Sequence, residues 1–286
     1  MPTFLDIGVL DLLGHLYIFG FGACVGSFLN VCILRIPLDI SVIHPSSRCS
    51  CGIAIPIYHN IPILSWFILL GKASCCNQRY SFRYPFVEFL TAAFFTIQWS
   101  LFSAPLIYVS FIFTFILIVV TFIDLDHLII PDRFSIGGAI LGILLSFCIP
   151  EMHAVLETGI QGQFVSAFKA LIGVLVGTGI CYWLRALFEI LLGKEAMGEG
   201  DVKFLGCVGA FCGWQGTMFS LFGGAFIGLV CILPILAINR ILGKRDHDPM
   251  IPFGPMLAFG AWLQFHFLRD WTNNYFENIY QIVVLN

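Results

Sequence analysis

Charged residues are scarce in this sequence. Only 11% of its 286 residues are Asp, Glu, Lys or Arg, whereas 59% are hydrophobic, and the mean hydropathy is +0.93. A soluble domain of this length could not bury so much apolar side chain, so the composition predicts a polytopic membrane protein. The net charge of −3 and the lack of a basic stripe interleaved with aromatic residues exclude a nucleic-acid-binding protein.

The sequence also lacks a secretory signal peptide, a nucleotide-binding fingerprint and internal repeats. The first apolar stretch, residues 12–34, has neither a basic leader region nor a small-residue cleavage site, and it is longer than a signal-peptide core. We therefore expect it to be a first spanning helix. No glycine-rich fingerprint follows a strand, so the residues alone indicate no independent nucleotide site.

Apolar windows long enough to cross a bilayer predict an all-α bundle of about eight transmembrane helices. The windows are residues 12–34, 86–103, 105–123, 134–148, 166–184, 202–213, 217–238 and 252–268. We expect two parts, namely residues 1–85, which contain the first helix and one long cysteine-containing loop, and residues 86–286, a seven-helix membrane domain. Two windows, 134–148 and 202–213, are short, so either the bilayer is thinned there or these helices pack inside the bundle.

The distribution of Lys and Arg predicts the orientation in the membrane. The loops opposite the long loop contain only Lys169 and Arg269, which places the N-terminus outside and the long loop in the cytoplasm. Two acids, Asp124 and Asp201, then fall at the cytoplasmic ends of their helices, where they could meet. The cytoplasmic side has Arg35, Arg48, Lys72, Arg79, Arg83, Arg133, Arg185, Lys194, Lys203, Arg240, Lys244 and Arg245.

These two acids carry the main functional hypothesis. An ionised Asp in hydrocarbon costs several kcal/mol, so acids at this depth usually face one another, water or a substrate. Asp201 follows a turn in which Gly198 and Gly200 permit a tight backbone and an open approach to a substrate. Paired aspartates, one ionised to activate water and one protonated to polarise the scissile carbonyl, are the chemistry of an aspartic protease.

The alternative is that each acid only caps a helix or extends into the interface. It applies most to the more exposed acids of the same loops, Asp126, Asp132 and Glu199. Lys203 also has two interpretations: it could hold a substrate carbonyl or stabilise the ionised pair, or it could be an ordinary interfacial lysine.

Four of the 11 cysteines lie in the long loop, which the charge distribution places in a reducing compartment. They are Cys49, Cys51, Cys75 and Cys76. Two pairs in one loop resemble a four-thiolate zinc knuckle, but the spacings C-x-C and C-C differ from the usual C-x-x-C. Zinc binding and chance clustering both remain open. Glycines spaced four residues apart, such as Gly173 and Gly177, predict close helix packing in lipid.

Eight short segments along the chain together resemble the type IV prepilin peptidases. They are residues 25–31 (VGSFLNV), 60–62 (NIP), 65–66 (SW), 83–88 (RYPFVE), 123–127 (IDLDH), 130–132 (IPD), 197–203 (MGEGDVK) and 251–255 (IPFGP). The resemblance implies an intramembrane aspartic protease of the Gly-x-Gly-Asp type in a bacterial inner membrane, with Asp124 and Asp201 as its catalytic pair. It implies prepilin and pseudopilin substrates of type IV pili or type II secretion, cleaved on the cytoplasmic side.

Many members of this family also methylate the new N-terminal amine with S-adenosylmethionine, an activity that the resemblance ties to residues 1–85. Glu88 is a candidate methyltransferase residue, or simply a helix-N-terminal acid stabilised by the helix dipole. The family motif would place thiols at positions 48 and 73, where this sequence has Arg48 and Ala73. Zinc, if bound, would be structural. The alternatives are a peptidase without methylation, an ion-coupled transporter and a non-enzymatic scaffold.

Overall fold

The computed structural model describes residues 4–44, 46–49, 51–155, 157, 159–193, 197–241 and 252–285. Across these ranges the regular elements are all helices, as the composition predicts. Four stretches are long and apolar enough to cross a membrane, namely Leu10–Leu38, Leu106–His127, Ile160–Leu192 and Glu199–Pro234. Lys194, Lys244, Arg245 and Ile251, which entered the sequence predictions, lie outside the described residues.

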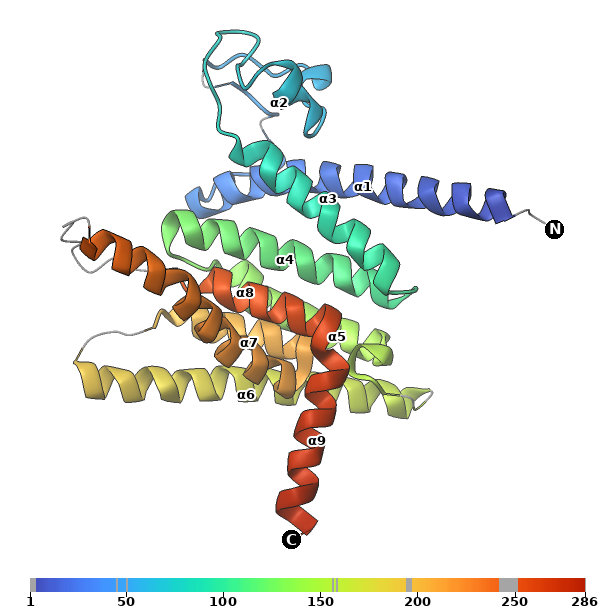
Figure 1. Ribbon diagram of the computed structural model, residues 1–286, viewed down its shortest axis with the longest axis vertical. Coiled ribbons are helices and arrows are strands. Elements are labelled where there is room, and N and C mark those ends of the chain that lie inside the picture. The colour runs from blue at the N-terminus through green and yellow to red at the C-terminus, as the bar shows by residue number, and fades with distance from the viewer. Residues whose placement is uncertain are drawn as a thin grey trace. The chain divides into compact units, whose positions relative to one another are not determined.

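The chain forms two compact units, Met1–Ile107 and Tyr108–Asn286. The division of the chain into residues 1–85 and 86–286 stays a prediction. In the first unit α3 (Arg83–Leu101) packs along α1 (Phe4–Arg35) (Figure 1). The two helices approach closely because α1 presents glycines to α3. A Cβ added at Gly22 would meet the backbone of Ala92, and one added at Gly26 would meet the backbone of Glu88.

A small folded region joins α1 to α3 in the first unit. It contains the helical turns η1 (Ile36–Leu38) and η2 (Ile57–His59) and the short helix α2 (Leu64–Ile68). Two isolated β-bridges, Arg48 to Ala54 and Lys72 to Arg79, each close a tight turn that contains one of the cysteine pairs.

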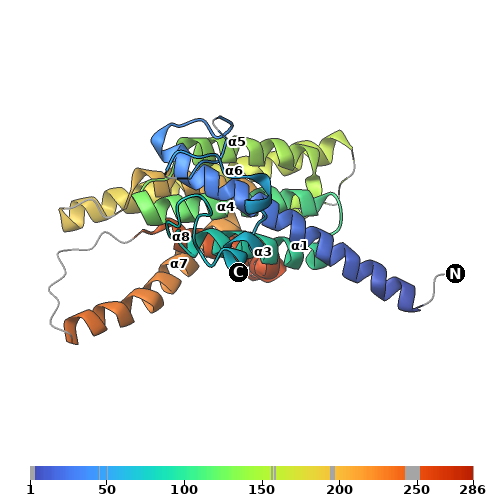
Figure 2. The same cartoon turned by 90° about the horizontal axis from the view of Figure 1, so that it is seen from above.

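The second unit begins near the start of α4 (Leu106–His127) and continues with α5 (Asp132–Cys148) and the turn η3 (Pro150–His153). The remaining elements are α6 (Ile160–Leu192), α7 (Glu199–Ile241), α8 (Gly254–Leu263), the π-helical turn η4 (Gln264–Leu268) and α9 (Arg269–Leu285). Helices α5, α6 and α7 pack against one another (Figures 1 and 2).

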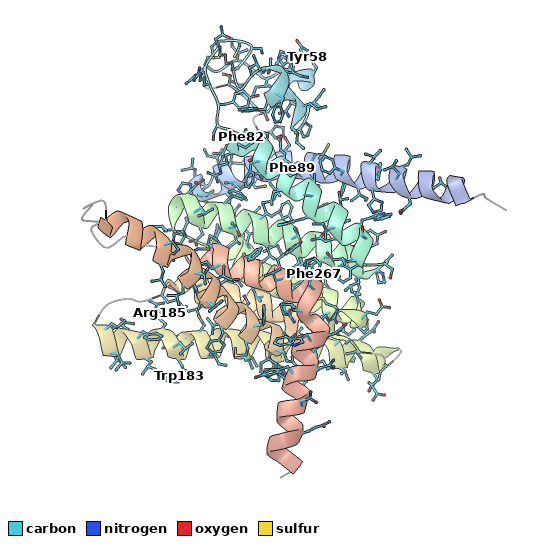
Figure 3. The ribbon with its side chains drawn as sticks, in the orientation of Figure 1. Tyr58, Phe82, Phe89, Trp183, Arg185 and Phe267 are labelled. Carbon is cyan, nitrogen blue, oxygen red and sulfur yellow. The ribbon has the colours of Figure 1, made fainter. Side chains whose placement is uncertain are left out.

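Helix α6 buries small side chains and exposes large apolar ones, which is the reverse of a soluble protein. Its buried residues are Gly162, Ser166, Ala170, Gly173, Gly177 and Cys181. Its exposed residues include Phe164, Phe168, Leu171, Leu175 and Trp183, and Trp183 projects away from the neighbouring helices (Figure 3). Small residues let helix backbones approach in lipid, while large apolar residues on the outside suit contact with acyl chains.

Helix α7 reverses direction at Gly213, whose φ of 70° and ψ of 178° are not helical. A Cβ added at Gly177 of α6 would meet both Leu205 and Thr217 of α7. A straight helix would hold these two residues about 18 Å apart, so the arms before and after Gly213 must fold back beside each other. They correspond to the predicted windows 202–213 and 217–238.

Candidate active site

Asp124 and Asp201 lie at the ends of two helices of the second unit. Asp124 is in the last turn of α4 and Asp201 in the first turn of α7. Only 5% of Asp124 and 9% of Asp201 is exposed, and the two side chains interact electrostatically. Like charges in a buried place repel strongly, so this arrangement needs a reason beyond helix capping.

One carboxylate oxygen of each aspartate is held by a backbone amide. The Gly254 N–H at the start of α8 donates to Asp124 Oδ2 at 2.9 Å, and the Gly198 N–H donates to Asp201 Oδ2 at 3.2 Å. Hydrogen bonds to an ionised acceptor are stronger than neutral ones. Asp124 is thereby held by a segment distant in sequence, and Asp201 by the turn that precedes it.

The start of α8 approaches Asp124 closely because residue 254 is glycine. A Cβ added at Gly254 would lie 2.7 Å from Asp124 Oδ2, so the carboxylate would have to shift. Gly200 has a related role, because a Cβ there would lie 3.1 Å from the Cβ of Ile130. Ile130 is buried and follows α4, so its contact with Gly200 brings the end of α4 against the start of α7.

Among the described residues, Lys203 pairs with two exposed acids and not with either buried aspartate. Its Nζ lies 3.0 Å from Asp132 Oδ1 and 3.0 Å from Glu199 Oε1. Both acids are exposed, as is Asp126. Lys203 therefore connects the start of α5 to the start of α7.

The four loop cysteines converge in the first unit. All four Sγ atoms lie within 4.8 Å of one another, with 3.5 Å between Cys49 and Cys76 and 3.4 Å between Cys51 and Cys75. A tetrahedral zinc ion with Zn–S bonds of about 2.3 Å would hold its sulfur ligands about 3.8 Å apart. The irregular spacing in sequence is thus compatible with one four-thiolate site.

Local hydrogen bonds also favour a thiolate in this cluster. The Cys51 backbone N–H and the thiols of Cys75 and Cys76 lower the pKa of Cys49 to about 6, while hydrogen bonds with Cys51 and Cys49 raise the pKa of Cys75 to about 12. The thiolate is the form that binds metal ions. The donor set therefore fits zinc.

Gly254 is a site residue for which sequence reasoning gave no role. It lies in one of the short segments that carry the family resemblance, but only its position beside Asp124 gives it a function. In the sequence, Gly254 is recognisable only as a glycine followed by Pro255 at the start of a helix. This pattern does not indicate which side chain accepts a hydrogen bond from the Gly254 N–H.

A helical, membrane-type bundle with two buried aspartates at helix ends has the features of the two-aspartate membrane enzymes. Residues 20–102 match the bacterial peptidase A24 N-terminal domain, and residues 111–233 match the type IV leader peptidase family. The chain belongs to the type IV leader peptidase family.

Curated relatives cover most of the chain and support this membership. A prepilin leader peptidase/N-methyltransferase of Dichelobacter nodosus is 34% identical, over 88% of this chain and 91% of its own length. Proteins with the same name from Aeromonas hydrophila and Myxococcus xanthus are 32% and 34% identical, over 86% of this chain and 88% and 71% of their own lengths. No solved structure matches the chain.

Proposed function

We propose that this protein cleaves the leader peptide from type IV prepilins and pseudopilins and then N-methylates the new N-terminal residue, with S-adenosylmethionine as the methyl donor. The observation that carries the peptidase assignment is the buried pair Asp124 and Asp201 in a chain of the leader peptidase family. The family's bifunctional relatives support the methyltransferase assignment.

The aspartate pair activates the water that attacks the scissile peptide bond. One carboxylate is ionised and takes a proton from the water, while the other is protonated and donates to the carbonyl oxygen. The amides of Gly254 and Gly198 each hold one oxygen of a carboxyl group, which leaves the second oxygen for water or substrate. The pair titrates as one unit, so neither residue is assigned the proton.

The membrane arrangement follows from the charge distribution. The protein lies in the bacterial inner membrane with eight crossing helices, its N-terminus in the periplasm and the aspartate pair at the cytoplasmic face. The apolar helix of a pilin lies alongside the bundle in lipid, and its leader presents the scissile bond at the interface. Helix α6, with its exposed apolar residues, suits such a lipid-facing surface.

Conservative substitutions test the peptidase assignment. Asp124→Asn or Asp201→Asn should abolish leader cleavage, measured by the mass of a prepilin incubated with the purified protein, because an amide cannot take the water's proton. Both variants should accumulate in the membrane as the wild type does. Cleavage retained by either variant would overturn the assignment.

The four loop cysteines form a structural zinc site that makes the region between α1 and α3 a small subdomain. Cys76→Ser should remove zinc, measured by elemental analysis of the purified protein, and should lower the unfolding temperature. Leader cleavage should persist, because the carboxylates activate the water without a metal. A protein purified without zinc, or one whose zinc survives this substitution, would contradict the proposal.

A further inference from the structure

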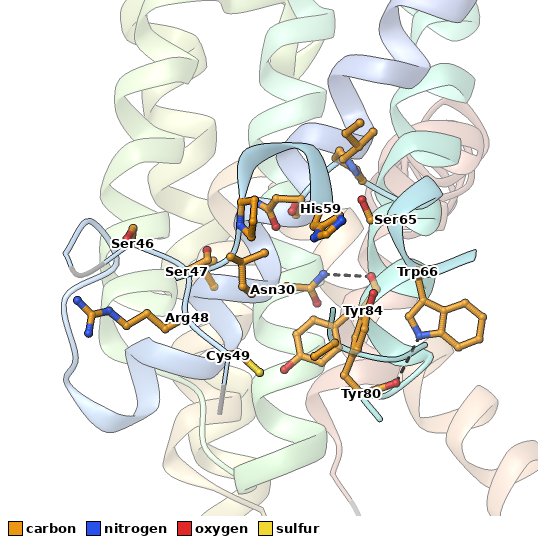
Figure 4. Close-up of a pocket in the computed structure, with 18 of the residues that line it drawn as sticks. Asn30, Ser46, Ser47, Arg48, Cys49, His59, Ser65, Trp66, Tyr80 and Tyr84 are labelled. Carbon is orange, nitrogen blue, oxygen red and sulfur yellow. Dashed lines mark hydrogen bonds between the residues drawn. The ribbon is translucent and has the colours of Figure 1, made fainter. Parts of the chain in front are cut away.

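A cavity of about 880 Å³ lies in the first unit, where three separate segments of the chain meet. Ser27 and Asn30 come from α1, Ser65 and Trp66 from α2, and Tyr84 and Glu88 from α3. Each of these residues belongs to a short segment that carries the family resemblance, yet none takes part in the aspartate pair. Figure 4 shows side chains gathered around the cavity, among them Asn30, His59, Ser65, Trp66, Tyr80 and Tyr84.

Hydrogen bonds between the segments fix the cavity wall. Asn30 Nδ2 donates to the Tyr84 carbonyl at 3.0 Å, and the Ile63 N–H donates to Glu88 Oε2 at 2.7 Å. Ile63 has a φ of 63°, which is rare and strained for a β-branched residue. The strained turn is thus held by the Glu88 carboxylate, and the site is formed before any ligand arrives.

One polar group in the wall lacks a partner within the part of the chain that is described. Ser65 Oγ is buried and has no hydrogen bond, and only 8% of the residue is exposed. A buried hydroxyl without a partner is costly, and such groups in native proteins usually meet a ligand or water. Its place in the wall of the cavity indicates a polar ligand group nearby.

The charges of the wall suit a zwitterionic ligand that also carries a cation. Glu88 is the one carboxylate among the described lining residues, and Arg48 and Arg79 supply positive charge. Aromatic rings of Trp66 and Tyr80 can stack on a planar base or face a cation. The volume lies within the range of about 300–1,000 Å³ that is typical of small-molecule sites.

A second large cavity among the described residues offers different chemistry. It has a volume of about 990 Å³, lies in the second unit, and is lined by Lys169, Arg269 and His153 beside a single acid, Asp270. The positive side chains disfavour a cationic ligand there. Arg269 also donates to the carbonyls of η3, so its guanidinium already has a structural role.

We propose that the cavity of the first unit is the binding site of the methyl donor, a proposal that rests on the proposed methyltransferase function. S-Adenosylmethionine carries an adenine ring, a carboxylate, an ammonium group and a sulfonium cation, and it supplies an electrophilic methyl group when bound. Glu88 neutralises positive charge of the donor, Ser65 donates a hydrogen bond to it or accepts one from it, and Trp66 contacts its adenine or its cation. Arginines of the loop pair with its carboxylate.

Binding measurements on the full-length protein in detergent micelles test this proposal without relying on activity. S-Adenosylmethionine and S-adenosylhomocysteine, whose sulfur is uncharged, are each titrated calorimetrically into the wild type, Glu88→Gln and Ser65→Ala. We expect Glu88→Gln to weaken binding of the charged donor about tenfold or more and binding of the uncharged analogue less. Ser65→Ala should weaken both ligands by a similar factor.

A matched control and a folding measurement make the result decisive. Asp11→Asn removes a carboxylate of α1 that does not line the cavity, and it should leave both affinities unchanged. Unfolding temperatures identify any variant that fails to fold, and Ser65→Ala, which removes one unpartnered oxygen, should keep the wild-type temperature. If the wild type binds the donor and neither cavity variant changes its affinity, the cavity assignment is wrong. If the wild type neither binds the donor nor transfers a methyl group, the proposed methyltransferase function itself is wrong.

Discussion

Gly254→Ala is the most informative single change in the aspartate site. The added Cβ would lie 2.7 Å from Asp124 Oδ2, whereas ordinary contact begins near 3.4 Å, so the carboxylate must withdraw by about 0.7 Å. That movement breaks or stretches the 2.9 Å hydrogen bond from the Gly254 N–H. The φ of Gly254 is not in the left-handed region, so alanine fits the backbone itself.

The expected loss of activity follows from this hydrogen bond. Hydrogen bonds to charged groups contribute about 1.5–3 kcal/mol, and each 1.36 kcal/mol on the barrier changes a rate tenfold. We therefore expect leader cleavage to fall by about 10- to 150-fold. A displacement of the Asp124 carboxylate by about 0.7 Å would also misplace it relative to the attacking water, which lowers the rate by a similar factor.

The assay measures the initial rate of prepilin cleavage by mass spectrometry, with protein reconstituted in liposomes. Gly179→Ala is the matched control, because a Cβ at Gly179 would meet nothing within 4 Å. It should cleave at the wild-type rate and unfold at the same temperature or slightly above it. If Gly254→Ala folds and cleaves within about twofold of the wild type, the amide of Gly254 does not support catalysis and our account of the site is wrong.

Two further predictions concern helix contacts around the site. Lys203→Met removes the ion pairs with Asp132 and Glu199. Because solvent screens exposed pairs, leader cleavage should fall less than tenfold, and Lys203→Arg should restore it. A complete loss of cleavage would instead indicate direct contact with substrate. Gly173→Ala should lower the free energy of unfolding by about 1–3 kcal/mol, since its Cβ would overlap the carbonyl of Gly209. Denaturation in mixed micelles measures this effect, and unchanged stability relative to Gly179→Ala would refute the close packing of α6 on α7.

Much of the fold could be predicted because lipid imposes a local rule. Every backbone polar group in the hydrocarbon must be satisfied within the segment, so a long apolar window indicates a helix. The windows 105–123 and 134–148 accordingly correspond to α4 (Leu106–His127) and α5 (Asp132–Cys148). The family resemblance and the choice of Asp124 and Asp201 also came from short local segments, and membership of the family is confirmed.

Contacts between distant segments could not be predicted, because a hydrophobic pattern fixes the type of an element but not its neighbours. Gly254 lies 130 residues from Asp124 along the chain, and only the path of α8 brings its N–H to that carboxylate. The pairing of Lys203 with Asp132 likewise depends on where α5 begins beside α7.

The sequence by itself thus determined a helical membrane protein, its two aspartates and its family. Only the tertiary structure decided that the backbone of α7 reverses at Gly213, that the four loop thiols converge despite their irregular spacing, and that three motif segments enclose one cavity around Glu88 and Ser65. The physical reason is that each of these features depends on backbone approach between residues far apart in sequence. Glycines such as Gly173 and Gly254 permit the close approach of two segments, but they do not specify which segment approaches.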